Sequence, residues 1–117
     1  MTFDLPIPPS TNNLFVTDKR THKRFPSPAY KAWRKSAGEE LMRQYNRYGA
    51  PAIHKPVSVH IRLNVNHQSD IANREKAITD LLVAKLEMPD DCWIDRILIE
   101  RDRTVEACVV SIEGASV

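Results

Sequence analysis

The segment 57–65 is the feature that most limits what this chain can fold into. Its apolar residues, Val57, Val59, Ile61, Leu63 and Val65, alternate without interruption with polar ones. Successive side chains of a β-strand point to opposite faces, so this alternation predicts a half-buried strand. It is the clearest strand signal in the sequence.

Two helices and several short strands are predicted around it. Ser27-Pro28 predicts a helix start, because serine caps a helix and proline suits its first position, and Gly49 predicts the helix end. A second helix is predicted after Asp70, because Ile71, Ile78, Leu81, Leu82 and Leu86 recur at helical spacing. A strand is predicted near a sheet edge at 2–7, and strands at 97–101 and 105–112 are expected to pair as a hairpin. The expected fold is α/β (α+β), a single small domain over residues 1–117 with a mixed β-sheet and two main helices.

Composition narrows the setting of the protein. No apolar run approaches the length of a membrane span, and the N-terminus lacks the basic and apolar regions of a signal peptide. Cys92 and Cys108 do not make a disulfide framework or a zinc site, so both are expected to be reduced core thiols. These features predict a cytoplasmic protein without a membrane partner.

Positive charge is concentrated in the first half of the chain. Residues 1–55 carry ten Lys and Arg against four Asp and Glu, whereas residues 56–117 carry seven against eleven. A basic half beside an acidic half suits a protein that holds a polyanion with one part and a metal with the other. The same asymmetry equally suits self-complementary surfaces in an oligomer.

The segment 14–26 is basic and contains two phenylalanines, Phe15 and Phe25. Basic side chains bind phosphates and aromatic rings stack on unpaired bases, so the segment predicts contact with nucleic acid. The alternative is a solvated loop with both rings in the core. The residues expected to bind DNA are Lys19, Arg20, Lys23 and Arg24 of this segment, Lys31, Arg34 and Lys35 of the following helix, and Asn73.

The segment 70–91 gathers carboxylates around a helix. Asp70 precedes the helix as a cap, while Asn73, Lys76 and Asp80 share one helical face. Asp90-Asp91 follows a short loop that is expected to bring the chain back towards Asp70. Carboxylates in such a cluster bind Mg²⁺, and a lysine beside the metal offsets charge on a phosphate. The alternative is a capped amphipathic helix followed by an acidic turn.

Two stretches together resemble the RusA-type Holliday junction resolvases. Leu5-Pro6-Ile7-Pro8-Pro9-Ser10-Thr11-Asn12-Asn13 is similar to the opening Pro-x-Pro-Pro-Ser-x-Asn signature of that family. Asp70-Ile71-Ala72-Asn73-Arg74-Glu75-Lys76, followed by Asp80 and Asp90-Asp91, is similar to its catalytic Asp-x-Asp-Asn-x-x-Lys motif and its downstream aspartate pair. The order of the predicted elements is similar as well.

This resemblance implies a homodimer that binds four-way DNA junctions and nicks two symmetry-related strands with Mg²⁺. Carried over by position, Asp70 and Asp91 are implied to be metal-binding catalytic carboxylates, and Lys76 is implied to assist catalysis. Asp90 adjoins the implied metal site.

Ala72 departs from the family pattern. The motif has an aspartate at this position, and an alanine methyl cannot coordinate a cation. The residues around Ala72 still fit the motif. An engineered Asp→Ala variant that binds its substrate without cutting it is the favoured explanation, and natural loss or relocation of the ligand is the other. The implied nuclease is therefore expected to be inactivated in this form.

Two functions from other classes fit the same residues. The first is a junction- or DNA-binding protein with no nuclease role, in which the acidic cluster is structural. The second is a metal-dependent nuclease acting on flaps or RNA. A basic segment and an acidic cluster are compatible with all three functions.

Overall fold

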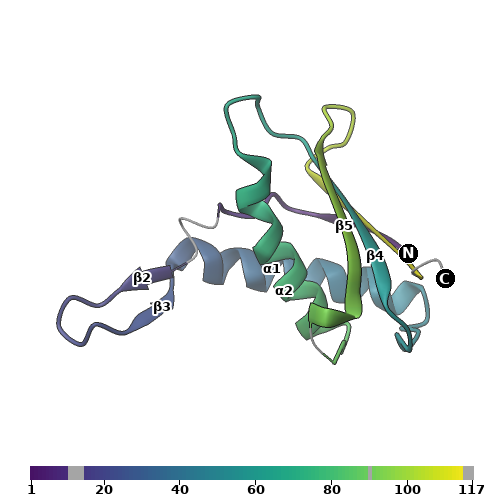
Figure 1. The fold of residues 1–117 in the computed structure, drawn as a ribbon, viewed down its shortest axis with the longest axis horizontal. Coiled ribbons are helices and arrows are strands. Elements are labelled where there is room, and N and C mark those ends of the chain that lie inside the picture. Colours follow the sequence, from purple (N-terminus) through teal and green to yellow (C-terminus); the bar gives the residue numbers. More distant parts are fainter. Residues whose placement is uncertain (11–14, 90, 115–117) are drawn as a thin grey trace.

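The computed structural model describes residues 1–10, 15–89 and 91–114, with Asp91 described by its backbone alone. In chain order the elements are β1 (Thr2–Leu5), β2 (Phe15–Thr17), β3 (Arg24–Pro26), α1 (Pro28–Arg47), β4 (Val57–Leu63), the 3-10 helix η2 (Ile71–Arg74), α2 (Glu75–Lys85), the 3-10 helix η3 (Asp91–Trp93), β5 (Ile94–Arg101) and β6 (Cys108–Gly114). The predicted α+β fold, with a mixed sheet and two main helices, is confirmed (Figure 1).

The alternating segment forms an inner strand of a four-stranded sheet with the order β1-β6-β4-β5. β5 runs parallel to β4, while β6 runs antiparallel to it on the other side. The predicted hairpin of the last two strands is therefore wrong, because β4 lies between them. A parallel neighbour requires a crossover connection, and η2 with α2 supplies it, so the strand after α2 takes one side of β4 and the last strand takes the other.

The core lies on one face of this sheet. The inward side chains of β4 are at most 5% exposed, and they belong to one apolar cluster with residues of both helices. The apolar spacing predicted for the second helix is confirmed, because Ile78, Leu81 and Leu82 are buried in that cluster. The other face of β4 carries Ser58, His60 and Arg62, which are only partly buried.

Helix α1 begins where the sequence predicts. The Ser27 hydroxyl accepts a hydrogen bond from the backbone N–H of Tyr30 at 3.1 Å, and Pro28 occupies the first turn, where no backbone N–H is needed. Gly49 follows the helix with a φ of +85°, a conformation that glycine adopts without a steric cost. Within the residues that the structure describes, neither helix has the length and apolar character needed to cross a bilayer.

The basic segment forms a β-hairpin rather than a loop. β2 and β3 pair antiparallel, with Val16 opposite Phe25. Asp18 closes the turn, because its N–H donates to the Lys23 carbonyl at 2.9 Å and its carbonyl accepts from the His22 N–H at 2.7 Å. The hairpin projects from the body of the molecule beyond the start of α1 (Figure 1).

Helix α1 covers the free edge of β1. The side-chain amide of Gln44 accepts from the Asp4 N–H and donates to the Asp4 carbonyl, both at 2.8 Å. The Tyr48 hydroxyl makes the same two bonds with Thr2, at 3.0 and 3.1 Å. Two side chains thus satisfy backbone groups that a further strand would otherwise pair. The Tyr48 side chain is 49% exposed at this edge.

We predict that Gln44→Ala lowers the free energy of unfolding by about 1–2 kcal/mol, because it removes both side-chain hydrogen bonds to the Asp4 backbone and leaves those backbone groups without a protein partner. Urea denaturation followed by circular dichroism measures the change. Asn46→Ala, at an exposed position of the same helix, is the matched control and should change stability little. Equal effects of the two substitutions would show that Gln44 does not secure the edge.

Candidate functional site

Both phenylalanines of the hairpin are exposed, Phe15 by 36% and Phe25 by 42%, and Phe15 also packs on the body of the molecule. The Phe15 ring packs edge-on against Tyr30 of α1, with 5.7 Å between ring centroids. Phe25 pairs across the hairpin with Val16, on the face opposite Phe15, and the two side chains are 42% and 38% exposed. The alternative with both rings in the core is therefore wrong, because Phe25 is an exposed apolar side chain on a projecting arm.

A guanidinium lies over each of the two rings in this contact. The Arg24 guanidinium lies 4.8 Å from the centre of the Phe15 ring, and the Arg34 guanidinium lies 4.8 Å from the centre of the Tyr30 ring. Cation–π contacts of this kind hold long side chains in place while their charge stays accessible. Lys19, Arg20 and Lys23 are exposed at the tip of the arm.

A basic groove continues from the arm along α1 and α2. Its volume is about 440 Å³, and it is lined by four cations, Lys31, Arg34, Lys35 and Lys85, and one carboxylate, Asp80. The Tyr30 ring also lines it. Burial, and then the Asp80 carboxylate, raise the pKa of the Tyr30 hydroxyl, so it remains a neutral hydrogen-bonding group at physiological pH. The excess of positive charge favours an anion such as a phosphate over a cation in this groove.

Asp70 lies at the other predicted site, where it caps η2. Its carboxylate accepts from the Ala72 N–H at 3.0 Å and from the Asn73 side-chain amide at 3.1 Å. The predicted cap is therefore confirmed. Asp70 is exposed, and Ala72 presents a methyl group beside it. Both acceptor contacts are compatible with further ligands, because a carboxylate has about four lone-pair directions.

Lys76 and Asp80 lie one turn apart on α2, as their spacing predicts. The Lys76 ammonium is 3.4 Å from the Asp80 carboxylate, and both side chains are about half exposed. An exposed pair of this kind contributes little to stability, so both groups remain available to a ligand. Asp80 also borders the basic groove, so it lies between the groove and Lys76.

Two arginines hold the loop that carries Asp70. Arg101, at the end of β5, donates to the backbone carbonyls of Asn66 and Ser69, at 3.2 and 2.6 Å. Arg74 donates from Nε to the Ser69 hydroxyl at 3.1 Å and from Nη1 to the Pro8 carbonyl. The loop before Asp70 is therefore positioned by charged donors from two other elements.

The bond between Arg74 and Pro8 joins the two motifs that the sequence singles out. Pro8 is fully buried, and the indole N–H of Trp33 donates to the nearby Pro6 carbonyl at 3.0 Å. The proline-rich motif therefore packs between α1 and the Asp70 segment. Its residues Thr11, Asn12 and Asn13 lie outside the described part of the chain.

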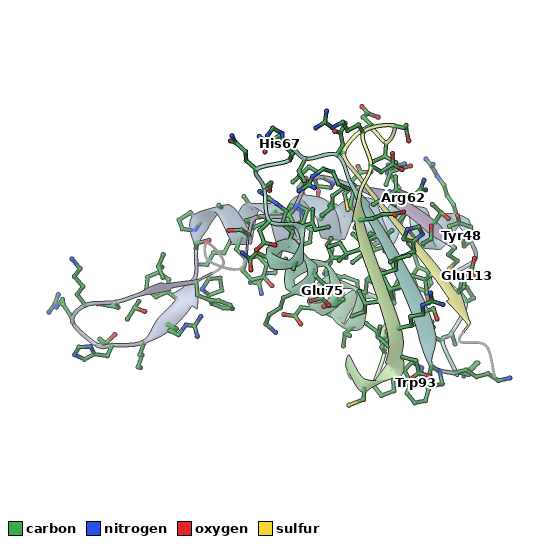
Figure 2. The ribbon with its side chains drawn as sticks, turned by 45° about the horizontal axis from the view of Figure 1, so that its top comes forward. Tyr48, Arg62, His67, Glu75, Trp93 and Glu113 are labelled. Carbon is green, nitrogen blue, oxygen red and sulfur yellow. The ribbon has the colours of Figure 1, made fainter. Side chains whose placement is uncertain are left out.

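The acidic turn does not return to Asp70 within one chain. Asp91 begins η3, which leads into the first residue of β5, whereas Asp70 follows a loop bound by the last residue of β5. His67 and Trp93 mark these two ends of the sheet in Figure 2. Helix α2 carries the chain from one end to the other, and β5 then spans about 26 Å at roughly 3.3 Å per residue. Asp90 and the Asp91 side chain lie outside the described residues.

Metal ligands do not cluster in the part of one chain that the structure describes. No group of three His, Cys, Asp or Glu side chains there is arranged to hold a metal ion. His67, in the loop before Asp70, is exposed.

Cys108 is buried as predicted, and burial raises the pKa of its thiol to about 12. Cys92 is exposed, so the prediction of a core thiol is wrong there, because η3 places it outside the sheet.

Arg74, Arg101 and Lys85 contribute to these sites and were not predicted from the sequence. Arg101 contacts the Asp70 loop because β5 runs parallel to β4, and no local pattern signals that pairing. Lys85 reaches the groove because α2 packs beside α1 so closely that a Cβ added at Gly38 would lie 3.0 Å from Cε of Lys85. Arg74 lies inside the recognised motif, where its contact with Pro8 gives no signal of its own.

Comparison with known proteins gives one assignment. The family model described as "Endodeoxyribonuclease RusA" matches residues 6–113, nearly the whole chain and both motifs. No curated protein matches the sequence significantly. RusA-type nucleases resolve Holliday junctions and generally depend on a divalent metal. Because the match covers nearly the whole chain, the chain belongs to the RusA endodeoxyribonuclease family.

Proposed function

We propose that this protein binds four-way DNA junctions as a homodimer and that, with Ala72, it nicks them little or not at all. The observation that carries the proposal is the continuous basic surface that runs from the hairpin into the groove between α1 and α2. Its four groove cations match the negative charge of a DNA backbone. Family membership supports a junction as the preferred shape of DNA.

Phosphate contacts are assigned to the arm and the groove. Lys19, Arg20, Lys23 and Arg24 lie on the arm, and Lys31, Arg34 and Lys35 lie on one exposed side of α1. Such contacts position a duplex arm without reading its sequence. Asn73, next to Asp70, is proposed to contact the strand that passes the acidic site. Phe25 and Val16 are proposed to enter the open centre of the junction and unstack a base step.

In a form of the chain with aspartate at position 72, cleavage is assigned to that aspartate, Asp70 and Asp91, with Asp90 beside them and Lys76 offsetting charge on the phosphate. Mg²⁺ is the proposed ion, because hard carboxylate oxygens suit it. The residues of the present chain do not fit a catalytic metal site. Ala72 supplies no ligand, and the described residues contain no group of three ligands.

A second copy of the chain is part of the proposal for two reasons. A junction has approximate two-fold symmetry, so a C₂ dimer presents one site to each of two strands. Asp70 and the start of η3 also lie at opposite ends of β5, so carboxylates from both places meet only if two chains contribute them. The dimer is therefore required by the substrate and by the proposed ligand set.

A DNA-binding protein without nuclease activity is the second candidate. The observation that favours it is the present role of Asp70, whose carboxylate already caps η2 through Ala72 and Asn73. In that case the acidic residues are structural. Restoring position 72 separates this candidate from a nuclease.

We predict tight junction binding that does not require Mg²⁺ and weakens steeply with salt, because each neutralised phosphate releases counterions. Gel-shift titrations at several salt concentrations measure the slope. Replacing both Lys31 and Lys35 by alanine should lower that slope by about two, since two phosphate contacts are lost. Equal affinity for a junction and for linear duplex of the same length would remove the structure-selective part of the proposal.

We predict that Phe25→Ala lowers junction affinity roughly tenfold while leaving stability nearly unchanged, because its ring is exposed and available to stack on bases. Phe15→Ala is the matched control. It should lower the melting temperature, because Phe15 packs against Tyr30. Thermal melting and gel shifts of both variants separate the two roles. Unchanged junction affinity in a folded Phe25→Ala protein would contradict the proposed insertion.

We predict that Ala72→Asp creates Mg²⁺-dependent nicking of a four-way junction, with a gain of roughly three orders of magnitude or more, because a missing ligand abolishes metal positioning. The assay compares junction, flap and linear duplex substrates. In the restored protein, Asp70→Asn should abolish the gain and Lys76→Ala should reduce it. Tight junction binding without any cleavage by the restored protein, in Mg²⁺ or Mn²⁺, would leave the DNA-binding candidate standing.

A further inference from the structure

The two edges of the main sheet differ in whether their outward backbone groups are hydrogen-bonded. Side chains of Gln44 and Tyr48 hydrogen-bond to the backbone of β1 at one edge. At the other edge, β4 is the only strand that pairs with β5 among the described residues. Unpaired edge strands readily add another strand, and proteins usually shield them. β5 therefore presents an eight-residue edge that is open to pairing.

This edge is apolar in its middle. Ile97 and Leu98 are 43% and 44% exposed, two of the few large apolar side chains that face solvent. The register with β4 places Ile97 and Ile99 on the core face and Leu98 on the outer face, so both faces of β5 are apolar at its centre. A partner strand would bury these side chains and extend the core across the edge.

The charges of β5 indicate which strand fits this edge. The sequence is symmetric in character about Leu98, because an isoleucine, a charged residue and a residue of the opposite charge follow it on each side. These residues are Ile97, Arg96 and Asp95 on one side and Ile99, Glu100 and Arg101 on the other. Two copies placed antiparallel about Leu98 therefore set Arg96 against Glu100 and Asp95 against Arg101, and each pairing occurs twice. We propose that β5 pairs with β5 of a second copy, antiparallel, with Leu98 on the two-fold axis.

Neighbouring registers do not give this match. A shift by one residue sets Asp95 against Glu100 in one direction and Arg96 against Arg101 in the other, so like charges oppose each other. A shift by two residues sets the Leu98 side chain against Arg96 or Glu100. The sequence of β5 therefore selects one pairing and disfavours the others, which is how a strand edge gains a specific partner.

Existing contacts of these charges are compatible with the pairing. Glu100 is 2.7 Å from His60 on the outer face, yet both side chains remain substantially exposed at 50% and 37%. Arg96 is exposed on the same face, beside Leu98, in a shallow groove of about 280 Å³. Arg101 is already bound to two backbone carbonyls, so the pairing of Arg96 with Glu100 carries more of the specificity.

The pairing rests on the homodimer of the proposed function and specifies its geometry. Four strands from each copy would form one continuous sheet. A two-fold axis perpendicular to the sheet keeps each face on its own side, so the helices of both copies, with the hairpins attached to α1, lie on the same side. Both basic surfaces then face one DNA junction.

A charge exchange tests the register. Arg96→Glu alone, or Glu100→Arg alone, sets like charges against each other twice in the dimer. Each should weaken the dimer roughly tenfold or more, given the usual strength of cross-strand charge pairs. The double variant, Arg96→Glu with Glu100→Arg, restores opposite charges and should restore the parent dissociation constant. Sedimentation equilibrium measures that constant, and circular dichroism confirms that each variant is folded.

Arg47→Glu is the matched control, because it makes the same charge change at an exposed position at the end of α1, which packs along the opposite edge of the sheet, and it should leave the dimer unchanged. The pairing would be overturned if the chain without these substitutions remained monomeric at micromolar concentration. A dimer that is insensitive to both single variants, or not restored by the double variant, would overturn it too. Gel shifts with the same proteins separate the β5 pairing from the proposed function. A protein that forms the β5 dimer but does not bind a junction would count against the proposed function alone.

Discussion

The fold depends on the burial of one face of β4 against the two helices, with β5 and β6 paired along its two edges. Its inward side chains are at most 5% exposed, and they contact a cluster to which both helices and the neighbouring strands contribute. Each such side chain gains roughly 1.5–3 kcal/mol when it leaves water. Because β4 is paired on both sides, this burial also fixes where the loop after β4 ends, and that loop carries Asp70.

The acidic site and the basic surface are positioned by different interactions. Hydrogen bonds from Arg101 to two loop carbonyls and from Arg74 to the Ser69 hydroxyl hold the Asp70 segment. Ring contacts from Phe15 through Tyr30 hold the arm, while its cations stay in solvent. Hydrogen bonds fix the direction of polar groups, and ring packing fixes an element without neutralising its charge. A nuclease needs both, since its carboxylates require exact placement and its cations require only proximity to phosphate.

Local chemistry made much of the fold predictable. Ser27-Pro28 and Gly49 set the limits of α1 through capping, and the alternation of 57–65 set β4. The cap formed by Asp70 and the pair formed by Lys76 and Asp80 follow from short spacings along the chain. The resemblance of two motifs to one family was likewise readable, because those residues keep their order and spacing.

Contacts between distant segments were decided only by the tertiary structure. The pairing of β5 and β6 on opposite sides of β4, the exposure of Phe25 and the bond from Arg74 to Pro8 join residues whose local patterns fit several arrangements. Sequence spacing also suggested that the acidic turn returns to Asp70, whereas the rise of α2 carries it to the far end of β5. The sequence by itself determined the elements, their caps and the residues able to do chemistry. The packing of those elements decided which residues meet, because non-local contacts depend on the whole core.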